Sequence, residues 1–241
     1  LDELRDRTSP KVLRRLKEDI LDLPDKIITP IYLDLKSKEY EKEMGEYVDW
    51  VDENQNKSLA IQLSKLTKVR QIIAQEKLHH TYELIDQALE QEKKVIIFTN
   101  FTRPLEEIYE KYSDIAVKLN GTMKKEERQE SVDRFQGDKN IKIFIANLKA
   151  GGVGITLTEA EVVIMNDLSF VPSDHSQAED RAFRIGQKNS VSCMYPIFEN
   201  SIEQIVYNML QNKKSVIDAV MGDNLADDTI LEHFIGELHK M

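Results

Sequence analysis

Residues 141–187 read IKIFIANLKAGGVGITLTEAEVVIMNDLSFVPSDHSQAEDRAFRIGQ, and this stretch decides the fold. Two short apolar runs, 141–146 and 162–165, are typical of buried parallel strands. A glycine-rich segment, 149–154, lies between them, and glycine lets a backbone come close to another group. The pattern therefore predicts two strands of a parallel sheet, joined through a loop that approaches a ligand.

A polar segment completes the same stretch. Gln177, Arg181 and Arg184 stand at i, i+4 and i+7, so in a helix all three would share one face. Two arginines and an amide beside a glycine-rich loop indicate a phosphate-facing surface. Taken singly, paired arginines are more often a solvated face, and glycines also mark ordinary turns.

Composition limits the class of protein. The 241 residues are 41% hydrophobic and 32% charged, enough for one large or two small domains. No apolar run approaches the ~20 residues that cross a bilayer. With 33 basic and 43 acidic residues the formal net charge is −10, so any DNA contact must come from a local patch. The single Cys193 excludes an internal disulfide and fits a reducing cytoplasm.

The rest of the chain alternates between helical and strand-like patterns, which predicts an α/β fold with a parallel sheet covered on both faces. Ligands of such sheets bind beyond the carboxyl ends of the strands. That edge would bring together residues 99–100, 121–122, 149–154 and the segment after Asn166. The predicted strands are 27–35, 95–99, 115–119, 141–146, 162–165 and 191–198, and the predicted helical segments are 37–80, 104–112, 124–135 and 201–220.

Two motifs in the deciding stretch carry a resemblance to a known family. Lys-Ala-Gly-Gly-x-Gly-Ile-x-Leu-Thr at 149–158 and Gln-Ala-Glu-Asp-Arg-Ala-x-Arg-Ile-Gly-Gln at 177–187 resemble motifs V and VI of the Swi/Snf family. That family consists of ATP-driven double-stranded DNA translocases within helicase superfamily two. Residues 8–26 and 66–72 also resemble the segment that leaves the first ATPase lobe and a helix of the protrusion.

The resemblance implies a RecA-like parallel sheet, the helicase C-terminal lobe, with an N-terminal helical protrusion and a C-terminal brace helix. The absence of an initiator Met or signal peptide at the start leads us to expect a fragment of a longer chain. The implied division is 1–28 as the segment leaving the first lobe, 29–80 as the protrusion, 81–200 as the RecA-like lobe, 201–222 as the brace and 223–241 as an acidic tail.

The resemblance also implies roles for individual residues. Arg181 and Arg184 match the motif VI arginine fingers that reach the terminal phosphate of ATP when two lobes close. The remaining nucleotide-associated positions are Gly152, Gly154, Gln177 and Asp180, and the implied contacts to DNA phosphates are Thr99, Asn100, Gly121, Thr122 and Lys149.

Three departures from the family pattern affect these assignments. Asn147-Leu148 replaces the usual Ser-Thr, which removes a hydroxyl contact to DNA, and 170–172 reads Phe-Val-Pro in place of Trp-Asn-Pro. Asn120 replaces the usual Asp of Asp-Gly-Ser/Thr, which should not weaken phosphate binding. Without the family, Asn120-Gly121 is a common turn dipeptide.

The parts that grip ATP are missing from the sequence. Phosphoryl transfer needs a Gly-rich loop with Lys and a metal-holding carboxylate, but there is no Gly-x-x-x-x-Gly-Lys-Ser/Thr and no Asp-Glu pair after a suitable strand. We therefore expect ATP and Mg²⁺ to be bound mainly by the first lobe, and the fragment alone to be inactive as an ATPase. We expect no metal site in the fragment itself.

Double-stranded DNA and the first lobe of the same chain are the expected partners, with no membrane and a monomeric state. The protein would be cytoplasmic in a prokaryote or nuclear in a eukaryote. A DNA-binding or protein-docking module with a vestigial enzymatic role is the alternative. A Rossmann-type enzyme is disfavoured by the missing GxGxxG, and an RNA helicase lobe by the Arg-Ile-Gly-Gln ending.

Overall fold

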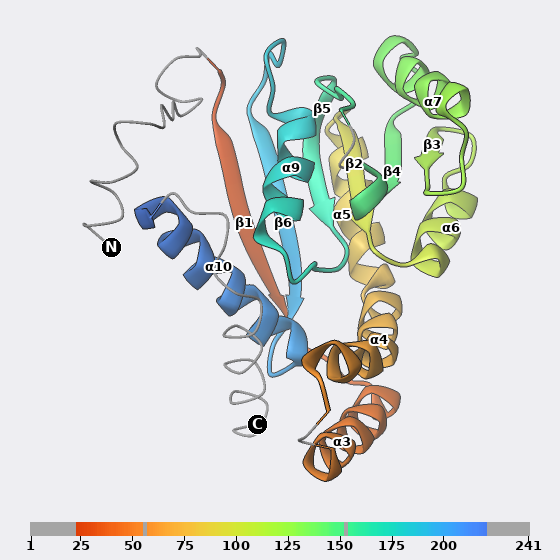
Figure 1. Ribbon diagram of the computed structural model, residues 1–241. Coiled ribbons are helices and arrows are strands. Elements are labelled where there is room, and N and C mark those ends of the chain that lie inside the picture. The colour runs from red at the N-terminus through yellow and green to blue at the C-terminus, as the bar shows by residue number, and fades with distance from the viewer. Residues whose placement is uncertain (1–22, 55–56, 152–153, 221–241) are drawn as a thin grey trace.

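The computed structural model describes residues 23–54, 57–151 and 154–220, and within them it forms one six-stranded sheet (Figure 1). The strand order is β1-β6-β5-β2-β4-β3, and every neighbouring pair is parallel. The strands are β1 Lys26–Leu33, β2 Lys94–Thr99, β3 Ala116–Leu119, β4 Ile143–Asn147, β5 Ala160–Met165 and β6 Val191–Phe198.

The sheet is buried on both faces because its central strands are mostly apolar. All six residues of β2 are buried, and alternate side chains point to opposite faces. Ile96 and Phe98 belong to one hydrophobic core, and Val95 and Ile97 to another. Continuous Val- and Ile-rich runs of this kind are typical of parallel strands covered on both sides.

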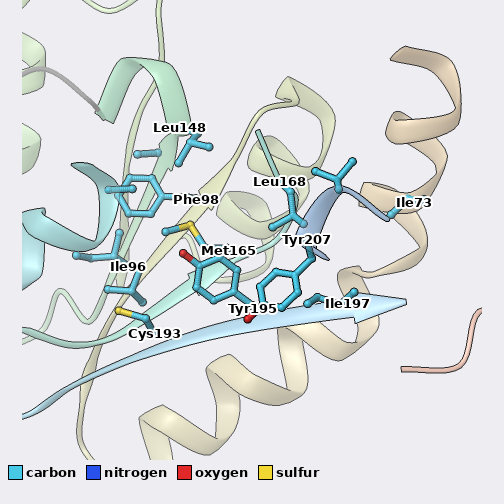
Figure 2. Packing of buried hydrophobic residues seen from close by; sticks show 14 of the residues in the cluster. Ile73, Ile96, Phe98, Leu148, Met165, Leu168, Cys193, Tyr195, Ile197 and Tyr207 are labelled. Carbon is cyan, nitrogen blue, oxygen red and sulfur yellow. The ribbon is translucent and has the colours of Figure 1, made fainter. Parts of the chain in front are cut away.

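Helices cover the two faces unequally. The first core joins the sheet to α3, α4, α7, α9 and α10, while the second joins it to α5 and α6. Figure 2 shows part of the first core, where Tyr195 and Ile197 from β6 pack near Tyr207 from α10. The helices are α3 Lys38–Glu53, α4 Leu59–Glu76, α5 Leu78–Glu90, α6 Thr102–Lys111, α7 Lys125–Gly137, α8 Leu148–Gly151, α9 Pro172–Ala182 and α10 Ile202–Val220.

The predicted α/β fold, its strands and its main helices are confirmed by these elements. Two of the predicted domain boundaries fall inside elements, however. β1 pairs with β6 along its whole length, so 28/29 cuts a strand of the main sheet, and 80/81 cuts α5, which packs on that sheet. Residues 1–22 and 221–241 lie outside the described part of the chain, and with them most of the segment predicted to leave the first lobe and the whole predicted acidic tail.

Ser201 and Gln204 bind backbone N–H groups at the start of α10. Ser201 Oγ accepts a hydrogen bond from Glu203 N at 3.1 Å. Gln204 reaches back to the N–H of Asn200, at 2.8 Å, one residue before the position of a standard capping box. Within the described residues no helix is both long and apolar enough to cross a membrane.

Candidate functional site

The strand order creates a crevice at the carboxyl edge of the sheet. β2 and β5 are neighbours, but β2 connects through α6 to β3 on one side, whereas β5 connects through α9 to β6 on the other. Loops that diverge from adjacent parallel strands leave a ligand site between them. The residues that follow β2 and β5 therefore form the centre of the candidate site.

Asp167 ties these two loops together. Its carboxylate accepts hydrogen bonds from Thr99 Oγ1 at 2.5 Å, from the Asn100 backbone N–H at 2.9 Å and from Asn100 Nδ2 at 2.5 Å. Asp167 is only 3% exposed, so these donors satisfy a buried charge. The sequence analysis placed the segment that begins with Asp167 at this edge, but it did not predict that Asp167 links the two loops.

The same hydrogen bonds correct one predicted contact. Thr99 was predicted to touch DNA, but it is 0% exposed and its hydroxyl donates to Asp167. Thr99 therefore positions the loop and does not present a group to solvent. Asn100 lies next to it, half-buried, and its side chain is also held by Asp167.

The loop after β4 joins the crevice through Asn147. Asn147 Nδ2 donates to the carbonyl of Asn100 at 3.0 Å, and its Oδ1 accepts from Lys149 N at 3.2 Å. The residue that departs from the family pattern thus links two loops and caps the short helix α8. Lys149 is exposed on α8, and Gly154 is exposed with a left-handed φ of +56°. Gly152 lies outside the described residues.

The predicted residues after β3 form a turn at the same edge. Asn120 Oδ1 accepts hydrogen bonds from both the backbone N–H and the hydroxyl of Thr122, at 3.1 and 2.8 Å. Gly121 and Thr122 are exposed, and Arg128 donates to the Gly121 carbonyl at 3.0 Å. β3 lies two strands from β2, so the loops that carry Asn100, Lys149 and Thr122 form a row over three neighbouring strands, whose axes span about 10 Å.

The prediction that one helix face carries Gln177, Arg181 and Arg184 is wrong. α9 ends at Ala182, so Arg184 lies in the loop beyond it. Gln177 is exposed, whereas Arg181 is 9% exposed. Asp180 is half-buried between them. The helix stops because Arg184 N bonds to the Ala182 carbonyl at 3.0 Å, which tightens the turn at its C-terminus.

Arg181 joins the two motif segments. Its Nη1 donates to the Ile155 carbonyl at 3.3 Å, and its own carbonyl accepts from Leu157 N at 2.9 Å. Burial, and then the nearby charge of Arg184, lower the pKa of Arg181, while Asp180 opposes them. Because guanidinium stays charged in proteins, the loop holds two cations close together.

Gln187 fixes the loop that presents Arg184. It is 7% exposed, and its Nε2 donates to the Ala160 carbonyl at 2.8 Å. Its Oε1 accepts from the backbone N–H groups of Lys188 and Asn189, at 2.8 and 2.9 Å. The last residue of the Arg-Ile-Gly-Gln ending therefore anchors the loop to β5, while Arg184 itself is exposed.

The helices before β2 close one side of the crevice. Arg70 of α4 donates to the Leu168 carbonyl, and its guanidinium lies 4.7 Å from the centroid of the Phe170 ring. Asn166 is fully buried and receives a hydrogen bond from Thr81 Oγ1 at 2.6 Å. Phe170, which replaces the family's Trp, thus provides an aromatic contact to a half-buried cation. No cluster of three or more potential metal-ligating His, Cys, Asp or Glu residues occurs in the described ranges.

A six-stranded parallel sheet with polar loops and an arginine-bearing segment at its carboxyl edge defines the RecA-like class of nucleotide-associated lobes. Residues 76–186 match the family model described as the helicase conserved C-terminal domain. The chain is 32% identical over 240 residues to an uncharacterized ATP-dependent helicase of Mycoplasma pneumoniae, covering 92% of this chain and 23% of that protein. It is 37% identical over 146 residues to a SWI/SNF-related subfamily A-like protein 1 of Drosophila melanogaster, covering 58% of this chain and 19% of that protein.

Solved structures agree with these relatives. The C-terminal domain of the Sulfolobus solfataricus SWI2/SNF2 ATPase is 26% identical with a TM-score of 0.67, covering 90% of this chain and 97% of that one. The core of the same ATPase in complex with dsDNA is 28% identical with a TM-score of 0.67, covering 95% of this chain and 55% of that one. These matches support a C-terminal, RecA-like lobe of the Swi/Snf type. It spans about a quarter of the length of the first curated relatives, 23% and 24%.

Proposed function

We propose that this chain is the finger-bearing second lobe of an ATP-driven double-stranded DNA translocase, whose first lobe binds ATP and Mg²⁺. The observation that carries the proposal is the loop after α9, which holds an exposed Arg184 next to Arg181 and is anchored by Gln187. Two neighbouring guanidinium groups repel each other, and a polyphosphate between them would relieve that repulsion. The residues present therefore fit the terminal phosphate of ATP.

ATP supplies the phosphoryl group when it is bound between the lobes. Arg184 contributes an exposed guanidinium that can approach the transferred phosphoryl group and stabilise the charge that develops on it. Arg181 is held by its contact with Ile155 and keeps the segment before Arg184 in place. Gln177 and Asp180, on the exposed side of α9, are the further groups that we place at the lobe interface.

DNA would be held through phosphates by the row at the carboxyl edge. Asn100, Gly121, Thr122 and Lys149 supply small donors and one cation along about 10 Å, a length that matches about three base steps of a duplex at 3.4 Å each. Contacts of this kind position a protein on the backbone and carry no base sequence information. A solved relative, the Sulfolobus solfataricus core, is described in complex with dsDNA, which supports duplex DNA as the partner.

The testing experiment is ATP turnover by the longer protein that carries both lobes, with duplex DNA, single-stranded DNA, RNA or no nucleic acid. Arg184→Ala is measured alongside Arg134→Ala, a control on the exposed surface of α7. We expect stimulation by duplex DNA and a loss of ~10³-fold or more in Arg184→Ala only. The 241-residue chain by itself is expected to show no turnover.

Less than a tenfold loss in Arg184→Ala would remove Arg184 from the finger role. No stimulation by any nucleic acid would favour a DNA-binding or protein-docking module with a vestigial enzymatic role.

A further inference from the structure

An ion pair joins Lys26, the first residue of β1, to α9. We call the segment after α9 that carries Arg184, residues 183–187, the finger loop. Lys26 Nζ lies 2.8 Å from Glu179 Oε2, and the side chains are 23% and 4% exposed. β1 is the edge strand beside β6, and the N–H of Val191 bonds to the Asp25 carbonyl at 2.9 Å. A rigid strand therefore delivers the lysine to the side of α9.

Lys26 contacts the arginine segment at two points. Glu179 stands two residues before Arg181, and Lys26 Nζ also lies 5.3 Å from the centroid of the Phe183 ring, directly before Arg184. The cation therefore bridges the last turn of α9 and the first residue beyond it. This is the place where the helix ends and the direction of Arg184 is decided.

The Glu179 carboxylate is fixed from a second strand. Tyr195 of β6 donates its hydroxyl to Glu179 Oε1 at 2.6 Å, and Tyr195 is buried. With Lys26 on one oxygen and Tyr195 on the other, the buried charge is satisfied by groups from two neighbouring strands. Burial lowers the pKa of Lys26, but Glu179 and then Asp180 outweigh that effect and raise it, so the lysine stays charged.

We propose that Lys26 and Glu179 are positioning residues for the arginine fingers, an inference that rests on the proposed role of Arg184. Gln187 anchors the far end of the finger loop to β5, and Lys26 anchors its near end to β1. Neither Lys26 nor Glu179 touches ATP. Both act through the placement of Arg181 and Arg184, where a shift of about 1 Å is enough to cost ~10²-fold in rate.

The test uses the longer two-lobed protein and the variants Lys26→Met, Lys26→Arg and Glu179→Gln. Lys118→Met is the control, because Lys118 is exposed to a similar extent as Lys26, 28% against 23%, and forms an ion pair with Glu106 away from α9. For each variant kcat, KM for ATP, Kd for duplex DNA and Tm are measured. We expect Lys26→Met and Glu179→Gln to lower kcat tenfold or more, with KM and Kd unchanged within about twofold.

Two comparisons distinguish positioning from plain stability. Lys26→Arg keeps the charge and the reach to Glu179, so it should restore kcat to within about threefold of the original protein, while Lys118→Met leaves kcat unchanged. Unchanged kcat in Lys26→Met and Glu179→Gln, with Arg184→Ala inactive, would overturn this proposal and leave the proposed function standing. The proposal would also be overturned if kcat fell only in proportion to the folded fraction of protein in Lys26→Met, Lys26→Arg and Glu179→Gln. Full activity in Arg184→Ala would instead remove the finger assignment itself.

Discussion

At the scale of single residues, the Asp167 carboxylate accepts hydrogen bonds from three groups of Thr99 and Asn100. Asp167→Asn keeps the shape of the side chain but turns one acceptor oxygen into a donor that faces Thr99 and Asn100. At least one buried donor then loses its partner, which costs about 1–3 kcal/mol. We expect the free energy of unfolding of the 241-residue chain, measured in urea, to fall by that amount.

Asp114→Asn is the control for this substitution, because Asp114 is exposed in the turn before β3. An exposed change of this kind should stay within about 0.5 kcal/mol of the original chain. Equal stability of the two variants would mean that the Asp167 bonds add nothing to the folded state.

His175 gives the chain a pH-dependent stability. Burial lowers the pKa of His175 below its ordinary 6.5, although Ser169 and nearby carboxylates oppose the shift. The unfolded chain therefore binds a proton below about pH 6.5 that the folded chain does not bind, so stability falls as pH falls. The slope from this one group is at most about 1.4 kcal/mol per pH unit.

The measurement is urea unfolding at several pH values between 5 and 8 for the original chain and for His175→Gln. The difference between the two curves isolates His175 from the carboxylates, which titrate in both proteins. We expect the original chain to lose more stability than the variant below pH 6.5. Parallel curves would show that His175 titrates as it does in the unfolded chain.

At the scale of elements, a buried ion pair connects the helices before β2 to α10. Lys77, at the junction of α4 and α5, pairs with Glu203 in the first turn of α10, and their side chains are 0% and 5% exposed. Removing one partner leaves the other charge buried, so Glu203→Leu should lower the free energy of unfolding by about 3–5 kcal/mol. The double variant Lys77→Met, Glu203→Leu should be less destabilised than Glu203→Leu.

A double-mutant cycle in urea checks this coupling, with the exposed pair Lys42 and Glu46 on α3 as the control cycle. The control pair should couple by about 0.5 kcal/mol or less. If Lys77 and Glu203 couple no more strongly than this pair, the ion pair contributes little to the packing of α10.

Elements were more predictable from the sequence than the contacts between them. Apolar runs such as Val95 to Thr99 have few alternatives to a buried strand, so the sheet could be read directly. The end of α9 could not be predicted in this way. The helical pattern continues to Arg184, but the hydrogen bond from the Arg184 N–H to the Ala182 carbonyl closes the turn earlier. The local sequence pattern does not indicate whether the helix or this turn is more stable.

The buried polar contacts of the site were missed for a related reason. Asp167, Asn147 and Glu179 look like ordinary surface residues in the sequence, and their partners lie 67, 47 and 153 positions away. A motif match locates Arg181 and Arg184, but only the fold shows which groups hold them. The site could be located from the sequence, whereas its supporting contacts needed the strand order.

At the scale of the whole molecule, the charge of −10 limits how the chain can meet DNA. A net negative charge disfavours contact with a duplex, so we expect any binding to come from the row at the carboxyl edge of the sheet. Of the four groups in that row, Asn100, Gly121, Thr122 and Lys149, only Lys149 is a cation. Few counterions are therefore released when the chain binds alone.

This count predicts the salt dependence of binding. We expect the 241-residue chain to bind duplex DNA weakly, with a slope of log K against log salt of about −1, because one neutralised phosphate contributes about −0.9. Lys149→Ala should bring the slope close to zero, whereas Lys139→Ala, exposed before β4 at the opposite edge of the sheet, should leave it unchanged. Fluorescence anisotropy with a labelled duplex at several salt concentrations measures both quantities. A slope of about −3 or steeper that Lys149→Ala leaves unchanged would place the DNA on a different, more basic surface, and the row at the carboxyl edge would lose its role.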